Sequence, residues 1–312
     1  MRLTSFSAAG WCAALLWAAP AGAVDWNAVQ GNSINLFYPG QASWEWVMTA
    51  TEHSGAPVFK DGKNCQECHD LEGKSELPMM GEKIVTGKKL ELTPIPGKAG
   101  SVVANVKMAH DAENFYVRLE FQNPPAAGEP MDANEVRVTM MLNDGKVAEA
   151  NRAGCWVACH DNLATMASAP EGQAITKYLM RSRVKMTRQG GAEIKPADDL
   201  KAMRTDGQVL EYWQAALNSG KPAKALDGYV LGTREFKRSQ VVTAEGQIEN
   251  GKTVVVLSRK LTAGGSYKDI VAGKSYVVGF AIHGGFAGRR YHWVSLEKTM
   301  TLDSGDANFV VK

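Results

Sequence analysis

Residues 101–122, SVVANVKMAHDAENFYVRLEFQ, decide the fold. Every second residue from Phe115 to Phe121 is apolar, which is the period of a β-strand with one buried face. Residues 101–110 predict a second strand, and the polar turn 111–113 joins the two. The chain is therefore expected to contain an antiparallel hairpin.

The strand pattern returns later in the chain. Further strands are predicted at 135–142, 230–236, 253–261, 275–282 and 291–296. The alternation is lost within 145–225, where helices are predicted at 171–181 and 210–219 beside a polar loop at 189–206. One more helix is predicted at 44–52, with Ser43 as its N-cap. Seven or so short strands with one long interruption predict a mainly β fold, an antiparallel β-sandwich with a helical insertion.

Residues 1–23 have the features of a secretory signal peptide. Arg2 supplies the positive charge, residues 8–19 are apolar, and Ala21-Gly22-Ala23 is a small-residue cleavage site. The apolar run is too short to span a bilayer, and no later stretch reaches 18 apolar residues. We therefore expect a periplasmic protein that starts at Val24 after cleavage and has no membrane span.

Two parts are predicted in the mature chain. Residues 24–97 form an N-terminal segment whose second half is dense in Gly, Lys and Pro, as expected for loops and short turns. Pro94 and Pro96 mark its end. Residues 98–312 form the sandwich, and the insertion at 145–225 belongs to it.

The composition excludes several classes of protein. Of the 312 residues, 45% are apolar and 22% are charged, so disordered, collagen-like and coiled-coil chains are excluded. A net charge of +2 excludes a strongly basic nucleic-acid binder. The five cysteines are more informative. Cys12 lies in the leader, and the other four form two pairs, each followed directly by histidine.

The first pair, Cys65-Gln66-Glu67-Cys68-His69, is the C-x-x-C-H attachment signature of c-type haem. Two thiols add to the two vinyl groups of the porphyrin, and the adjacent histidine is the proximal ligand of the iron. A zinc site would need a second pair of matching spacing, and a redox dithiol would not need His69. The motif therefore predicts a covalently attached haem c.

The second pair, Cys155-Trp156-Val157-Ala158-Cys159-His160, has one residue more between its thiols. A wider loop can still present two thiols to two vinyl groups, and Cys159 keeps its neighbour His160. The alternative is a structural disulfide between Cys155 and Cys159, which an exported protein can form but which leaves His160 unexplained. The prediction is a second haem c with His160 as its proximal ligand.

Several side chains can fill the distal positions of the two irons. Imidazole and the methionine thioether are both suitable, and methionine gives the higher potential. The candidates are His53, His110, His283, His292, Met79, Met80 and Met166. His53 is predicted for the first haem, because a short loop with Gly55 lets it fold back, and His110 is the alternative. His283 and His292 flank one loop and can reach one site.

Five stretches in the last two thirds of the chain share a pattern with a known family. They are residues 106–119 (VKMAHDAENFYVRL), 135–142, 212–215 (YWQA), 278–282 (VGFAI) and 294–296 (VSL). Through them, residues 98–312 resemble the haem-binding domain of the ethylbenzene dehydrogenase γ subunit and its relatives in dimethyl sulfoxide reductase-type complexes. In that family a β-sandwich holds one haem b between a methionine and a lysine.

The chain departs from that pattern at both iron ligands. The methionine position falls near Cys155–His160, and the lysine position falls at or beside His292. The resemblance therefore implies a covalent variant of the same pocket, with His160 and His292 on the two faces of the iron and His283 as the alternative to His292. The segment around Cys65–His69 looks like the added c-type haem segment of periplasmic dihaem relatives.

These features favour a periplasmic dihaem c-type cytochrome that transfers single electrons between respiratory redox partners. Partner proteins would dock transiently on lysines near the first motif, namely Lys60, Lys63, Lys74, Lys83, Lys88 and Lys89. A membrane quinol dehydrogenase and a molybdenum enzyme are the candidate partners. One alternative is a haem enzyme, a reductase or dehydrogenase, with one open iron site. Another, suggested by the resemblance, is the haem subunit of a molybdenum oxidoreductase complex.

Overall fold

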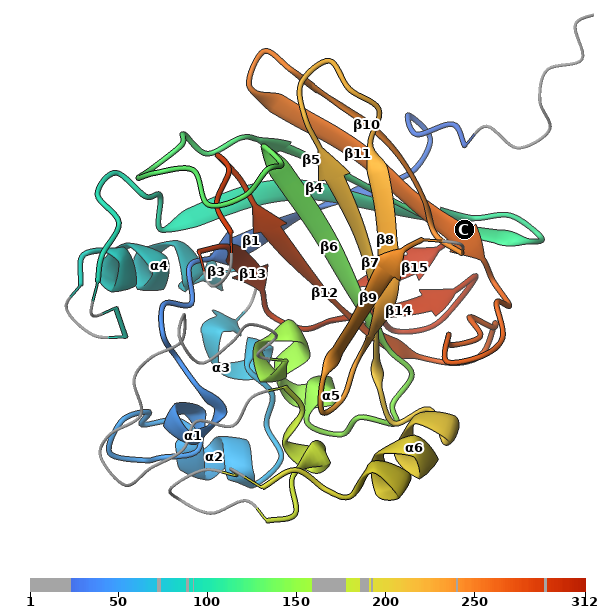
Figure 1. The fold of residues 1–312 in the computed structure, drawn as a ribbon. Helices are drawn as coiled ribbons and strands as arrows, with labels where there is room; N and C mark the ends of the chain where they lie inside the picture. Colours follow the sequence, from blue (N-terminus) through green and yellow to red (C-terminus); the bar gives the residue numbers. More distant parts are fainter. Residues whose placement is uncertain are drawn as a thin grey trace, which may run out of the picture.

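A computed structural model describes residues 24–71, 74–87, 90–91, 93–158, 178–185, 191, 193–239, 241–288 and 291–312. A sheet of 13 strands dominates this part of the chain (Figure 1). In the order in which they pair, its main strands are β10 (Thr243–Glu249), β11 (Lys252–Lys260), β5 (Asn114–Gln122), β4 (Ser101–His110), β1 (Gly31–Phe37), β13 (Trp293–Ser295), β12 (Tyr276–His283), β6 (Val136–Asn143), β7 (Leu210–Leu217), β8 (Lys224–Val230) and β9 (Arg234–Arg238). All of these pairs are antiparallel, which confirms the mainly β, antiparallel fold.

Two short strands complete the sheet. β14 (Lys298–Leu302) pairs with β12, and β15 (Phe309–Val311) runs parallel to β14. The sheet curves back on itself, so that β10 lies against β7 and β8. The main core fills the space inside this curve. It contains Phe115, Val117, Leu119 and Phe121 of β5, each at most 3% exposed, as the alternation in the sequence predicts.

Three neighbouring strands, β6, β7 and β12, are buried on both faces. Their inner face packs into the main core, whereas the other face is covered by the short helices of the chain. We call this second surface the covered outer face. Its register places Phe37, Val294 and Ala281 in one row across β1, β13 and β12, and pairs Gly279 with Met141 of β6. Cys65 of the first motif and residues 155–158, the described part of the second, pack on this surface.

The helices are short and gather on one side of the sheet (Figure 1). They are α1 (Trp44–Val47), α2 (Ala56–Lys60), α3 (Gln66–His69), α4 (Leu77–Val85), α5 (Ala150–Ala153) and α6 (Ala197–Thr205), with 3₁₀ turns η1 (Gly154–Val157) and η3 (Met180–Ser182). A small hairpin, β2 (Asp70–Leu71) and β3 (Lys74–Ser75), follows α3. In the described residues no helix is long and apolar enough to cross a membrane.

The structure corrects the predicted insertion at 145–225. Residues 210–219 do not form a helix, because Leu210–Leu217 is strand β7, which lies between β6 and β8. All eight of its residues are buried, and a short run buried on both faces lacks the alternation that identifies a half-buried strand. The predicted polar loop at 189–206 contains helix α6. Most of the helix predicted at 171–181 lies outside the described residues.

The N-terminal segment also differs from the prediction. Strand β1, for which the sequence predicts no strand, lies inside the sheet, between β4 and β13. The helix predicted at 44–52 ends at Val47. Its N-cap is correct, because the Ser43 hydroxyl accepts a hydrogen bond from the Trp46 N–H at 3.3 Å.

A buried ion pair ties β7 to β11. Arg259 donates from Nε to Glu211 Oε1 at 2.8 Å and from Nη2 to Oε2 at 3.2 Å, and both side chains are almost fully buried. Trp213 Nε1 also donates to Glu211. Removing one member of such a pair leaves the other charge buried without compensation.

We expect Arg259→Leu to lower the free energy of unfolding by about 3–5 kcal/mol, because the Glu211 carboxylate stays buried. Lys260→Leu is the matched control. Its ammonium group is exposed and lies 4.0 Å from Glu113, so the expected loss is about 1 kcal/mol or less. Chemical denaturation at neutral pH measures both, and equal losses would contradict the assignment of the pair as a core interaction.

Candidate haem sites

The first motif forms a single turn of helix, α3, which is capped at its start. Asn64 Oδ1 accepts from the Glu67 N–H at 2.7 Å, and Glu67 Oε2 accepts from the Asn64 N–H at 2.8 Å. This reciprocal cap satisfies two backbone N–H groups. Cys65, Cys68 and His69 are spaced i, i+3 and i+4, so both thiols and the imidazole lie on one side of the turn.

The rings of His53 and His69 face each other, with centroids 6.1 Å apart and 29° between their planes. A metal–imidazole bond is about 2 Å long, so two imidazoles on opposite sides of one metal have their bonded nitrogens about 4 Å apart. Each ring centre lies roughly one ring radius farther from the metal than its bonded nitrogen does. The distance between the ring centres therefore exceeds the distance between the nitrogens by about two ring radii. The observed spacing therefore fits one iron between the two rings.

A backbone carbonyl orients the His53 ring, because its Nδ1 lies 2.9 Å from the Val47 carbonyl oxygen. His69 Nδ1 lies 3.7 Å from Glu76 Oε2, which is beyond hydrogen-bond distance. Metal-bound histidines commonly direct their second nitrogen at a carbonyl or carboxylate, which fixes the tautomer and leaves Nε2 for the metal. The Trp46 ring packs against His53 at 5.0 Å and limits its rotation.

His53 and His69 both line one cleft. Its lining residues are Phe37, Trp46, Val47, His53, Gly55, Phe59, Asn64, Cys65, Cys68, His69, Leu77, Met80, Trp156 and Leu296. Apart from the thiols, the imidazoles and one amide, this wall is apolar and largely aromatic. Two thiols, two facing imidazoles and an apolar wall fit a covalently attached haem.

The second motif begins on the covered outer face. Cys155 is buried, and a β-carbon added at Gly279 would lie 2.7 Å from its sulfur and 3.2 Å from its backbone nitrogen. Only glycine leaves room for this approach of η1 to β12. Cys159, His160 and Met166 lie outside the described residues, so the second haem and the alternative disulfide both stay predictions.

His283 and His292 are brought together as a buried pair. Their rings stack with centroids 4.4 Å apart and 18° between the planes. This spacing is too short for one iron between them, since opposite ligands need about 4 Å between the bonded nitrogens alone. At most one of the two can therefore be an axial ligand of a given iron, and the opposite ligand must come from elsewhere.

The other candidate ligands lie in different surroundings. His110 does not line the cleft, and both its ring nitrogens have partners: Nδ1 lies 3.1 Å from the Asp111 carbonyl oxygen and Nε2 lies 3.0 Å from Asp303 Oδ1. Met80 lines the cleft, whereas Met79 is 51% exposed. His53, and not His110, therefore lies beside His69.

No family model matches the chain. Cytochrome c-552 of Stutzerimonas stutzeri is 38% identical to it over 291 residues, which cover 92% of this chain and 89% of that protein. Cytochrome c-551 of Rhodocyclus tenuis is 31% identical over 279 residues, which cover 88% of this chain and 92% of that protein. The chain belongs to the c-type cytochromes. A solved structure from Bacteroides uniformis aligns with a TM-score of only 0.28 at 10% identity, over 63% of this chain and 70% of that one.

As a c-type cytochrome, the protein carries haem c and transfers electrons. Within the described residues, the C-x-x-C-H motif and the cleft around it have side chains that fit that cofactor. The resemblance to the ethylbenzene dehydrogenase γ subunit stays a prediction.

Sequence reasoning missed several residues near the motifs, among them Phe37, Trp156, Gly279 and Glu297. Trp156 carried a signal, because a large aromatic residue between two haem-binding thiols is placed to touch a porphyrin. The other three are far from both motifs in the sequence, and only the pairing of β1, β12 and β13 brings them near.

Burial changes the protonation of groups near the first motif. The pKa of His69 is lowered by burial and by His53, which favours the neutral imidazole that binds iron. Burial, followed by the negative charge of Glu297, raises the pKa of the unattached Cys65 thiol. Burial also raises the pKa of Glu297 to about 7. Glu297 Oε1 accepts from the Gln66 N–H at 2.8 Å, while Oε2 has no hydrogen-bond partner in the described part of the chain.

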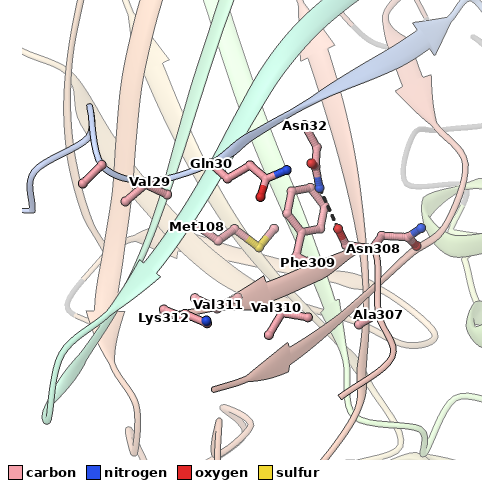
Figure 2. A pocket seen from close by; sticks show the side chains of 11 residues that line it. Val29, Gln30, Asn32, Met108, Ala307, Asn308, Phe309, Val310, Val311 and Lys312 are labelled. Carbon is pink, nitrogen blue, oxygen red and sulfur yellow. Dashed lines mark hydrogen bonds between the residues drawn. The ribbon is translucent and has the colours of Figure 1, made fainter. Parts of the chain in front are cut away.

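A second depression lies near the C-terminus, between the start of β1, β4 and β15. Figure 2 shows the Asn32 amide hydrogen-bonded to the Asn308 carbonyl, at 2.6 Å, with Met108 and Phe309 beside them. No cysteine or histidine is among its lining residues. This depression therefore has no attachment chemistry.

The raised pKa of Glu297 makes the stability of this cytochrome depend on pH. The folded state holds this proton up to about pH 7, whereas the unfolded chain releases it near the ordinary value of 4.5. Stability therefore falls as the pH rises through this window. The variant Glu297→Gln keeps an acceptor for the Gln66 N–H. We expect its free energy of unfolding to equal that of the wild type at pH 4.5 and to be higher than that of the wild type at pH 8. Denaturant unfolding at both values measures this.

The exposed Glu245 on β10 provides the control for that experiment. Glu245→Gln is expected to follow the wild type at both pH values. If Glu297→Gln is also as stable as the wild type at both pH values, the Glu297 carboxyl does not titrate between pH 4.5 and pH 8.

Proposed function

We propose that this cytochrome is a periplasmic dihaem electron carrier. The observation that carries the proposal is the facing pair of imidazoles, His53 and His69, beside the thiols of Cys65 and Cys68. A haem bound there supplies a one-electron iron(III)/iron(II) couple. Two filled axial positions leave no room for a substrate at the iron, which favours a carrier over an enzyme with an open site.

At the first site, each side chain has a defined role in the proposal. Cys65 and Cys68 form the thioethers, His69 is the proximal ligand, and His53 is the distal ligand. The aromatic and apolar wall excludes water from the iron, and the Val47 carbonyl holds the His53 ring in place.

At the second site, Cys155 and Cys159 form the thioethers, His160 is the proximal ligand, and His292 is the distal ligand, with His283 as the alternative. Gly279, which contacts Cys155, and His283 are four residues apart on β12 and so share one face of the strand. His292 stacks on His283. This shared face supports one pocket between Cys155 and the histidine pair.

Docking of an acidic redox protein is proposed on the lysines near the first site. Lys60, Lys63, Lys74 and Lys83 are exposed, while Lys88 and Lys89 lie outside the described residues. Such a contact would be small, transient and weakened by salt. A membrane quinol dehydrogenase and a molybdenum enzyme remain the candidate partners, and the signal-like residues 1–23 support a periplasmic location.

The haem count is tested by mass spectrometry of the purified cytochrome under denaturing conditions. We expect two haem masses added to the mature chain, because thioethers survive unfolding. One added haem mass together with a Cys155–Cys159 disulfide would refute the second site.

His53→Ala is expected to open the first site only. The protein should gain a high-spin component and bind carbon monoxide rapidly at one of its two haems, as recorded by absorption spectroscopy. His110→Ala is the matched control and should stay fully low-spin. The assignment fails if the two variants behave the other way round, and the carrier function fails if the unaltered protein already binds carbon monoxide.

A further inference from the structure

Glu297 carries a buried carboxyl group to which the electron-carrier function assigns no role. It lies between β13 and β14 and is 4% exposed. Its Oε1 accepts from the Gln66 N–H at 2.8 Å, so the carboxyl group is bound to the residue that follows Cys65 in the first motif. Its Oε2 is buried and has no hydrogen-bond partner in the described part of the chain. One oxygen is therefore held by the motif, and the other can hold a proton.

The packing around Glu297 keeps this group away from water. Gly154 lies so close that a β-carbon there would be 3.1 Å from the Glu297 Cα, and its φ of 52° also favours glycine. The preceding residue, Leu296, is 3% exposed and lines the cleft together with Cys65. A carboxylate in such a place loses most of its hydration, which disfavours the charged form.

The charged groups nearby only partly compensate for this loss. The charged and titratable groups near the Glu297 carboxyl and the Cys65 thiol are Lys298 of β14, Glu67, Cys65 and Cys68 of the first motif, Asp70 of β2, Arg152 of α5 and Cys155 of η1.

The balance of these charges favours a protonated Glu297. The Lys298 ammonium favours the carboxylate, but it already pairs with Asp70 Oδ2 at 2.7 Å. Glu67 adds a negative charge that opposes ionisation of Glu297. A thioether cannot ionise, and burial raises the pKa of the Cys155 thiol to about 12.

We propose that Glu297 is the redox-linked proton acceptor of the first haem site. Glu297 takes up one proton from water, forming an O–H bond at Oε2, when the ferric iron gains one electron from a redox partner. It releases that proton to water when the iron is oxidised again. This inference rests on the first haem site of the proposed function and does not need the second.

Electrostatics couples the two events. Reduction removes one positive charge from the site, and the Coulomb interaction with a buried carboxyl group is weakly screened. Glu297 therefore binds its proton more tightly beside ferrous than beside ferric iron. By linkage, the reduction potential must fall as the pH rises through the interval in which Glu297 ionises. This interval lies near neutral pH, because burial raises the pKa of Glu297 to about 7.

The first test measures the reduction potential of the intact cytochrome from pH 5 to pH 9 by spectroelectrochemistry. We expect the equilibrium constant for reduction of one haem to fall by about tenfold, which corresponds to about 59 mV for a one-electron couple. Potentials that do not change with pH overturn the inference. Mass spectrometry of the same sample counts the haems, and a single haem whose potential falls with pH would refute only the dihaem proposal.

The second test assigns the proton to Glu297. Glu297→Gln keeps an acceptor for the Gln66 N–H but cannot ionise. We expect its potential to equal the wild-type value at pH 5 and to stay there at pH 9, where the wild-type potential has fallen. The haem propionates also titrate, but both proteins contain them, so the difference between the two profiles belongs to Glu297.

Glu245→Gln is the matched control, because it removes one exposed carboxylate on β10. Its potential should follow the wild type at every pH. The inference is overturned if Glu297→Gln also keeps the pH dependence of the wild type.

If Glu297→Gln attaches less haem than the wild type, Glu297→Asp decides. The shorter side chain still ionises, but its carboxyl group cannot occupy the same position beside Gln66. We expect its potential to fall with pH about a different midpoint. A midpoint equal to that of the wild type would assign the proton to another group and overturn the inference.

Discussion

Burial of β6, β7 and β12 on both faces is the constraint on which the rest of the structure depends. The inner face is covered by the sheet itself, which curves around the main core. The outer face carries apolar residues such as Met141 and Ala281, and these need a second cover. The segments around Cys65 and Cys155 provide part of it. The C-x-x-C-H motif is therefore part of the packing of the sheet.

The same packing explains how such short helices persist. Helix α3 has four residues, far fewer than an isolated helix needs for stability in water. Its backbone is held instead by hydrogen bonds from outside the motif, from Cys65 to Arg152 and from Gln66 to Glu297. The Lys298 ammonium adds contacts to Gln66 and Asp70 at 2.6 and 2.7 Å. The sheet thus positions the thiols, and the helix turn orients them.

The sequence predictions were right where a local pattern of residues identifies the element. Half-buried strands alternate strictly, so 101–110 and 114–122 were predicted with the bounds that the structure shows. The prediction for β7 was wrong because a strand buried on both faces has no alternation. β1 was missed because its partners β4 and β13 are distant in the chain.

The sequence by itself indicated the attachment chemistry. The two thiols and the proximal imidazole of C-x-x-C-H are neighbours in the chain, so the covalent backbone fixes the spacing between them. It also indicated that His53 could return to the first site, since a short loop with Gly55 permits it. Only the tertiary structure decided that His53 faces His69, that His283 stacks on His292, and that Trp156 reaches the first cleft. These contacts depend on which strands pair and which face they cover, and that is settled by burial over the whole chain.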